Sequence, residues 1–570
     1  MKKWIVLFIV TLIATALWWN KGYILYAHRY WKTTPDSAFA HHRTSSVDIA
    51  YTPGTPVAQN LAKLTSELEN NLKGSEQRLN FKLQFPLKAY IYNTFEEKGA
   101  HVRSIELAQA DLDEKTIHII WNSTFNGLAE GIEYQILLHE KYGDAYDQRW
   151  SRAATAALAD RWNHKTLEDW QSFLEKRQLI PIKLNEPRVS EFISTSYAAI
   201  VAKDILNTQG FEAFVKLYKD GNVPGQYQPK KIETRVVHAT NRRRQFEPVF
   251  QKGMTYAYWN SVDAGYAGSK SKRSLRLLKE SGVDWIAAVP YGFMQDHDDP
   301  LMHNAGHHIH TENDESLFQL ALDARQLGIK ILLKPQIWIS HEAWPGKVNM
   351  NNDADWNHWF ENYEYWIVHY AVIAELMGAD LFCIGTELVQ TTLQHPQQWR
   401  NIISKVREVY SGPIVYAANW GKEFEEITFW DALDYIGLDN YYPVRESTKD
   451  DVDVIRAGFA EQKKKLAAVA NRWQKPILFT EIGYIANEGA GMGSQESNFT
   501  KYNEKAQAEC YKTALETYWN EPWFAGMYWW KWFSNPDDQG RNADEHSPHG
   551  RLAGKILAEQ YAKPRFIEPR

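Results

Sequence analysis

Two short apolar segments of the chain each end in a glutamate. Residues 379–387 have the sequence ADLFCIGTE, and residues 475–481 have the sequence KPILFTE. Short apolar runs of this kind are typical of buried strands in a parallel sheet, where a carboxylate is costly unless it lies at the strand end and has a task. Two such carboxylates could supply the acid and the nucleophile or base that glycosidic bond cleavage needs. Glu387 and Glu481 are therefore the candidate catalytic pair.

The segments around both glutamates belong to a longer alternation of strands and helices. The alternation predicts an α/β fold in which residues 250–560 form a (β/α)8 TIM barrel, with Glu387 on the fourth strand and Glu481 on the seventh. In such a barrel, polar residues at the carboxyl ends of the strands face the catalytic mouth. The strands are expected at residues 254–259, 285–289, 329–334, 381–385, 414–417, 435–438, 477–480 and 526–530.

Most of the predicted strand ends carry polar or aromatic side chains. Tyr441 could donate a hydrogen bond to a nucleophilic carboxylate and keep it ionised, and Lys334 adds positive charge nearby. The ends together predict a polar pocket lined with aromatic rings. Two alternatives remain open: a strand-end glutamate can form a structural ion pair, and a barrel can bind sugar without cutting it. The polar and aromatic residues at the predicted strand ends include Trp259, Lys334, Glu387, Trp420, Asn440, Tyr441, Glu481 and Trp530.

Residues from 253 to about 534 also resemble the barrel glycoside hydrolases of family 113, β-mannanases of a large retaining clan. The matching segments are ILLKPQIW, FCIGTEL, LDNYYP, LFTEIGY, YWWKW and the tryptophan-rich block at residues 356–363. The resemblance implies that Glu387 is the acid/base and Glu481 the nucleophile. It also implies substrate contacts from Lys334, Trp420, Tyr441 and a tryptophan of the eighth strand, Trp530. Trp259 and Asn440 are added as substrate contacts because they stand at strand ends. Thr386 stands where larger clan members often carry asparagine, which removes one contact to the sugar 2-hydroxyl.

Composition narrows the choice of ligands. The 570 residues carry a net charge of −6, which gives no support to nucleic-acid binding. The two cysteines suggest no disulfide framework and have no metal-ligand spacing, so no cofactor and no metal are expected. Histidines and aspartates between residues 296 and 310 could bind a metal, but they match no specific zinc pattern. They are expected to form a polar rim over the substrate groove.

The first 30 residues predict export. Met1-Lys2-Lys3 precedes an apolar segment that ends near Trp19. This pattern fits either a cleaved signal peptide or an uncleaved single-pass membrane anchor, and the anchor is the preferred interpretation. The bulk of the chain is then expected in the cell envelope, outside the cytoplasm, or secreted if the segment is cleaved. Protein partners cannot be named from the sequence.

Residues 35–235 are expected to form an α+β domain. Within it, His139-Glu140 begins like the zinc motif H-E-x-x-H, but the second histidine position is Gly143. Asp160 stands where a third ligand would lie. The segment resembles a gluzincin peptidase domain that has lost its ligands; the alternatives are an ordinary helix pair and an active zinc peptidase. A basic stretch from Lys230 to Arg244 is expected to link this domain to the barrel.

The sequence thus predicts a retaining glycoside hydrolase that acts on β-linked polysaccharide or oligosaccharide, with a mannan-type polymer as the preferred substrate. The alternative from another class is a non-catalytic polysaccharide-binding protein of the cell envelope, built on the same barrel.

Overall fold

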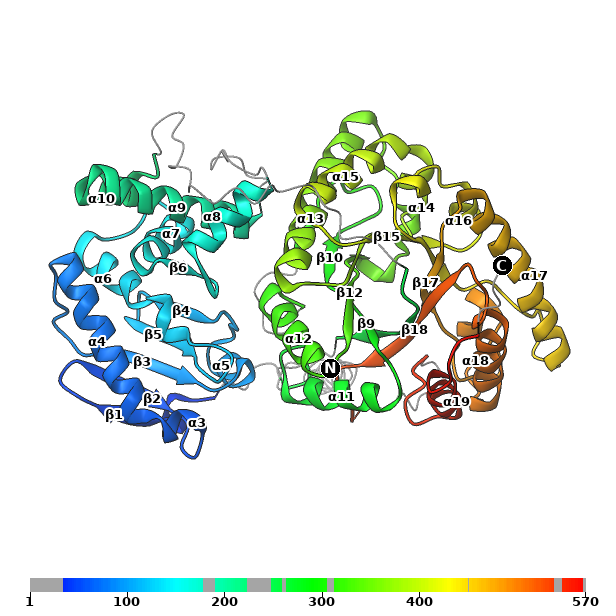
Figure 1. Cartoon of the computed structure of the whole chain (residues 1–570), viewed down its shortest axis with the longest axis horizontal. Coiled ribbons are helices and arrows are strands. Elements are labelled where there is room, and N and C mark those ends of the chain that lie inside the picture. The colour runs from blue at the N-terminus through cyan, green and yellow to red at the C-terminus, as the bar shows by residue number, and fades with distance from the viewer. Residues whose placement is uncertain are drawn as a thin grey trace, which may run out of the picture.

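The computed structural model describes residues 34–177, 190–222, 248–258, 263–304, 312–449, 451–537 and 546–566. Its elements fall into two groups, a mixed sheet with helices at the N-terminal side and a barrel at the C-terminal side (Figure 1). The predicted membrane segment at residues 1–30 and the basic stretch at 230–244 lie outside the described residues. Within the described part, no helix is long and apolar enough to cross a membrane. The exact domain boundaries stay a prediction.

Eight parallel strands close into a barrel, and each corresponds to a strand predicted from the sequence. Neighbouring strands pair in chain order, and β18 pairs with β8 to complete the circle. The TIM-barrel prediction is therefore confirmed. The strands are β8 (Gln251–Ala257), β9 (Trp285–Ala288), β12 (Lys330–Leu333), β14 (Leu381–Thr386), β15 (Ile414–Asn419), β16 (Ile436–Asn440), β17 (Ile477–Ile482) and β18 (Phe524–Phe533).

Helices surround the barrel and bury the outward faces of its strands (Figure 1). The longest of these, α13, begins where the Asn352 side chain accepts a hydrogen bond from the backbone N–H of Asp355. Its C-cap is Gly378, whose φ of 69° favours glycine. The main helices are α11 (Ser269–Glu280), α12 (Asp314–Gln326), α13 (Asp353–Met377), α15 (Pro396–Val409), α17 (Val452–Trp473), α18 (Glu504–Tyr518) and α19 (Leu552–Tyr561), with the short α14 (Val389–Gln394) and α16 (Lys422–Glu426) near the mouth.

Apolar side chains fill the inside of the barrel. Residues such as Leu332, Cys383, Val415 and Leu478 form a buried cluster inside the ring of strands. The interior is therefore a packed core rather than a pore, as is usual for this fold. Polar groups that serve chemistry are left to the carboxyl ends of the strands.

The N-terminal group contains a five-stranded sheet in the order β1-β2-β3-β5-β4. Pairs β2–β3 and β3–β5 are parallel, whereas β1–β2 and β4–β5 are antiparallel. This mixed sheet with its helices agrees with the predicted α+β organisation. The elements are β1 (Ala40–Arg43), β2 (Val47–Tyr51), β3 (Leu87–Tyr92), β4 (Ala108–Asp111), β5 (Thr116–Ile120), α4 (Leu61–Leu79), α6 (Glu133–Tyr142), α7 (Gln148–Ala159), α8 (Leu167–Lys176), α9 (Glu191–Gln209) and α10 (Phe211–Asp220).

The peptidase resemblance of this domain finds no support in the structure. Helix α6 ends at Tyr142, and its C-cap is Gly143, the position of the missing second histidine. His139 lies 3.2 Å from Asp144, and Glu140 forms an ion pair with Lys115 at 3.1 Å. In the part of the chain that the structure describes, no three His, Cys, Asp or Glu side chains are grouped so that they could hold a metal. An ordinary helix pair describes His139 and Glu140 better.

Candidate active site

Both candidate glutamates line one cavity at the carboxyl ends of the barrel strands. Its volume is about 480 Å³. Glu387 follows β14 and Glu481 belongs to β17, so the cavity receives one carboxylate from each of the two strands named by the sequence. The lining residues are Trp344, Glu387, Asn419, Trp420, Tyr441, Glu481, Ile485, Gly493, Ser494, Glu496, Ser497 and His546.

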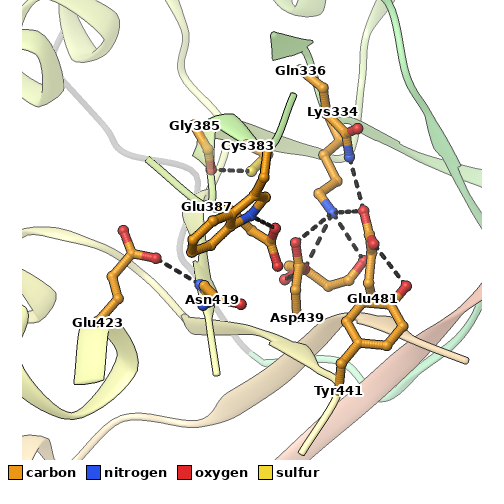
Figure 2. A network of polar contacts seen from close by, with 12 residues as sticks. Lys334, Gln336, Cys383, Gly385, Glu387, Asn419, Glu423, Asp439, Tyr441 and Glu481 are labelled. Atoms are coloured by element: carbon orange, nitrogen blue, oxygen red, sulfur yellow. Dashed lines mark hydrogen bonds and ion pairs between the residues drawn. The ribbon is translucent and has the colours of Figure 1, made fainter. Parts of the chain in front are cut away.

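Hydrogen-bond donors hold the carboxylate of Glu481 from both sides (Figure 2). Its Oε1 accepts from Lys334 Nζ at 2.5 Å and from Gln336 Nε2 at 2.8 Å. Its Oε2 accepts from the Tyr441 hydroxyl at 2.9 Å, as the sequence predicted. Because Glu481 is 7 % exposed, these donors replace the water that a negative charge would otherwise need. The geometry holds this carboxylate in a fixed orientation, with donors at both of its oxygens.

Lys334 also contacts a second buried carboxylate. Its Nζ lies 3.2 Å from Asp439 Oδ1, and both side chains are completely buried. Thr480 Oγ1 donates to the same Asp439 oxygen at 2.7 Å. Burial disfavours the charged ammonium, but Asp439 and Glu481 outweigh it and raise the pKa of Lys334. Burial, and after it the charge of Glu481, raises the pKa of Asp439. Lys334 is thus shared between the cavity and the barrel interior.

Glu387 lies in a different environment. Its backbone has a φ of 51°, in the left-handed region, and its amide donates to Ala417 O at 2.8 Å. Trp344 Nε1 donates to its carboxylate at 2.7 Å. Burial, followed by repulsion from Glu481, raises the pKa of Glu387 to about 7. A carboxyl group with this pKa keeps its proton to near neutral pH and can act as a general acid.

A third glutamate, Glu423 on α16, supports the cavity wall from outside. It is buried and accepts hydrogen bonds from Tyr416 at 2.7 Å and from the backbone N–H of Asn419 at 2.6 Å. The Tyr416 hydroxyl in turn accepts from the backbone N–H of Leu388 at 2.8 Å. Burial raises the pKa of Glu423 to about 7. Glu423 thereby ties the end of β15 to the residue that follows Glu387.

The predicted substrate contacts differ in where they lie. Trp420 and Tyr441 line the cavity, and Lys334 lies beneath it against Glu481. Trp530 is part of β18 but is not among the cavity residues, and Trp259 lies outside the described residues. Contact between these residues and a substrate stays a prediction.

The side chain of Asn440, another predicted substrate contact, is directed to a helix and not to the cavity. Its side chain donates to Gln462 of α17 at 3.1 Å and does not line the cavity. Successive side chains of a strand point to opposite faces. Because Asp439 points into the barrel towards Lys334, the next residue must point outward to the helices.

Other residues in or next to the cavity had no role assigned from the sequence. Trp344 and Gln336 each donate to one of the two glutamates. Glu496, which is buried, accepts from the backbone amides of Ile485 and Gly491, both at 2.7 Å, and so fixes the loop that forms one wall. His546 approaches Tyr441 with a ring separation of 6.5 Å. The histidines of the expected rim at 307–310 lie outside the described residues.

Comparison with known proteins matches the barrel to one family. The model of glycoside hydrolase family 113 matches residues 254–551, which is more than half of the chain. The chain belongs to glycoside hydrolase family 113. It is therefore a glycoside hydrolase, and the resemblance of the barrel noted from its sequence is confirmed. No curated protein matches the chain.

One solved structure of family 113 agrees with this assignment. A family 113 β-mannanase from Alicyclobacillus acidocaldarius, in complex with ManMIm, is 26 % identical, with a TM-score of 0.50; the match covers 55 % of this chain and 97 % of that one. A complex of a family 113 β-1,4-mannanase is also 26 % identical, with a TM-score of 0.49, covering 55 % of this chain and 100 % of that one. The family match accordingly concerns the barrel and leaves residues before 254 outside.

Proposed function

We propose that the chain is a retaining glycoside hydrolase that cleaves β-linked polysaccharide or oligosaccharide of mannan type. The observation that carries the proposal is the pair Glu387 and Glu481 at one cavity, one carboxyl with a pKa near 7 and the other surrounded by donors. Membership of family 113 and similarity to a β-mannanase support the substrate class.

In the proposed reaction, Glu481 attacks the anomeric carbon while Glu387 gives its proton to the departing glycosidic oxygen. Gln336 and Tyr441 hold the two Glu481 oxygens in place, and Lys334 balances its charge before the attack. Glu387, now ionised, takes a proton from water in the second step, and that water releases the sugar from Glu481. Two inversions return the β configuration.

The experiment that tests the proposal measures reducing-end release from β-1,4-mannan, cello-oligosaccharides and bacterial exopolysaccharides, and follows the product anomer by proton NMR. We expect hydrolysis of the mannan with β product formed first. An α product would refute the retaining mechanism, and hydrolysis of another polymer would refute the mannan assignment. Binding of mannan without any release would favour the non-catalytic alternative.

Replacing Trp344 with phenylalanine should shift the basic limb of the pH–rate profile upward. The indole N–H stabilises ionised Glu387 and so lowers its pKa, against burial and Glu481, which raise it. Without this hydrogen bond, burial and Glu481 raise the pKa of Glu387 unopposed, so Glu387 keeps its proton to higher pH. The measurement is kcat/KM against pH on one mannan oligosaccharide. A basic limb that stays in place or moves to lower pH would argue against Glu387 as the acid.

We further propose that the enzyme is exported and tethered by residues 1–30, on the strength of their charged start and apolar run. Membrane fractionation of cells with and without deletion of this segment tests the tether. Full-length chain in the soluble envelope fraction would contradict it.

A further inference from the structure

A small sheet lies beside the mouth of the barrel. Strand β10 (Tyr291–Met294) follows β9, strand β13 (Gln336–Ile339) follows β12, and β11 (His303–Asn304) completes the order β11-β10-β13. Strands β10 and β13 are parallel, with Tyr291 opposite Gln336 and Phe293 opposite Trp338. The register therefore places two large aromatic residues next to each other.

The two faces of this sheet differ in exposure. Met294, Ile337 and Ile339 are buried, and a Cβ atom on Gly292 would lie 2.8 Å from the Trp366 ring of α13, so one face packs against the barrel helices. Side chains alternate along a strand, which turns the other face outward. On that face Phe293 is 37 % and Trp338 43 % exposed. We call these two residues the aromatic platform.

The aromatic platform is connected along the chain to residues that contact both catalytic glutamates. Gln336, which donates to Glu481, shares a face of β13 with Trp338, about 7 Å further along the strand. An antiparallel bridge between Ile339 and Ala343 then turns the chain back, and Trp344 donates to Glu387. One segment, residues 336–344, thus contacts both carboxylates and carries Trp338 between the two contacts.

The indole of Trp338 has a neighbour that supports it. The Tyr291 ring meets it edge to face, with ring centroids 5.9 Å apart. An exposed tryptophan held in this way loses little freedom when a ligand stacks on it. His303, opposite Phe293 on β11, adds a polar group at the platform edge. Flat aromatic surface with polar groups beside it suits the apolar face and hydroxyl rim of a pyranose ring.

We propose that the aromatic platform is an outer sugar-binding subsite, which stacks on a pyranose unit of a β-linked chain beyond the units held at Glu387 and Glu481. This inference rests on the proposed function and extends it to substrate length: the enzyme prefers a polymer or a long oligosaccharide. The distance along β13 from Gln336 to Trp338 is similar to the length of one sugar ring. The next sugar unit of a bound polysaccharide therefore reaches the aromatic platform.

The test compares short and long substrates in Trp338→Ala and Phe293→Ala. On mannohexaose, kcat/KM should fall about 3- to 10-fold in either variant, the size expected for losing one stacking contact. On the chromogenic 4-nitrophenyl β-mannobioside, it should stay unchanged. Tyr146→Ala, which removes an aromatic residue of the N-terminal domain that is 63 % exposed, is the matched control and should change neither value. An equal fall on both substrates, or no fall on mannohexaose, would overturn the subsite.

A binding measurement separates this inference from the proposed reaction. Calorimetry gives the Kd of mannohexaose for Glu481→Gln with and without Trp338→Ala, and no catalysis is needed. Weaker binding in the double variant supports the sugar-binding role of the aromatic platform. This holds even if the wild-type enzyme does not hydrolyse mannan and the proposed function is refuted. Equal binding by both, or no binding of mannohexaose by either, overturns the platform.

Discussion

Glu481→Gln should lower kcat on β-mannan at least about 10⁴-fold, because an amide cannot attack the anomeric carbon. The substitution keeps the shape of the side chain. Tyr441 and Gln336 can still contact it, and Asp439 still balances the charge of Lys334. We therefore expect an intact fold with lost turnover, measured by reducing-end release together with circular dichroism and thermal unfolding.

Glu387→Gln is the matched comparison, since it changes the other carboxylate of the same cavity in the same way. Its loss should be smaller on a substrate whose leaving group needs no proton, such as a nitrophenyl glycoside. Added azide should restore turnover in this variant and yield a β-glycosyl azide, because Glu481 still forms the covalent intermediate. Full activity in Glu481→Gln, or azide rescue of that variant to the β product, would contradict the assigned roles.

The barrel could be predicted from the sequence because each strand is a short apolar run with turn residues at its ends. A strand that is buried on both faces of the sheet is easily recognised in the sequence, as the segments before Glu387 and Glu481 show. The order of pairing then follows from right-handed connections between parallel strands. Tyr441 could be placed beside Glu481 because neighbouring strands of a barrel end at the same mouth.

The contacts of Gln336 and Trp344 could not be predicted in the same way. Trp344 reaches Glu387 because the chain reverses at the bridge between Ile339 and Ala343, and such a reversal leaves no periodic pattern in the sequence. The orientation of the Asn440 side chain could not be predicted for a related reason. Three polar or aromatic residues follow one another at the end of β16, and the sequence does not say which of them continues the alternation into the barrel.

Lys334→Met should destabilise the barrel by about 3–5 kcal/mol in the free energy of unfolding, the usual cost of leaving one member of a buried ion pair alone. Methionine matches lysine closely in length, so lost packing contributes little. Asp439 keeps the hydrogen bond from Thr480 but loses its cation, and it is completely buried. Urea unfolding followed by tryptophan fluorescence gives the difference. Lys464→Met, at a lysine whose side chain is 78 % exposed, should change stability by well under 1 kcal/mol.

The double variant Lys334→Met with Asp439→Asn separates the two tasks of Lys334. Asp439→Asn removes the carboxylate that Lys334→Met leaves without a cation in the barrel interior. The double variant should therefore recover most of the lost stability. Activity should not recover, since Glu481 still lacks the cation that lies 2.5 Å from its Oε1. If stability and activity return together, Lys334 acts through Asp439 alone; if neither returns, the loss comes from packing and the charge of Lys334 is not what the site requires.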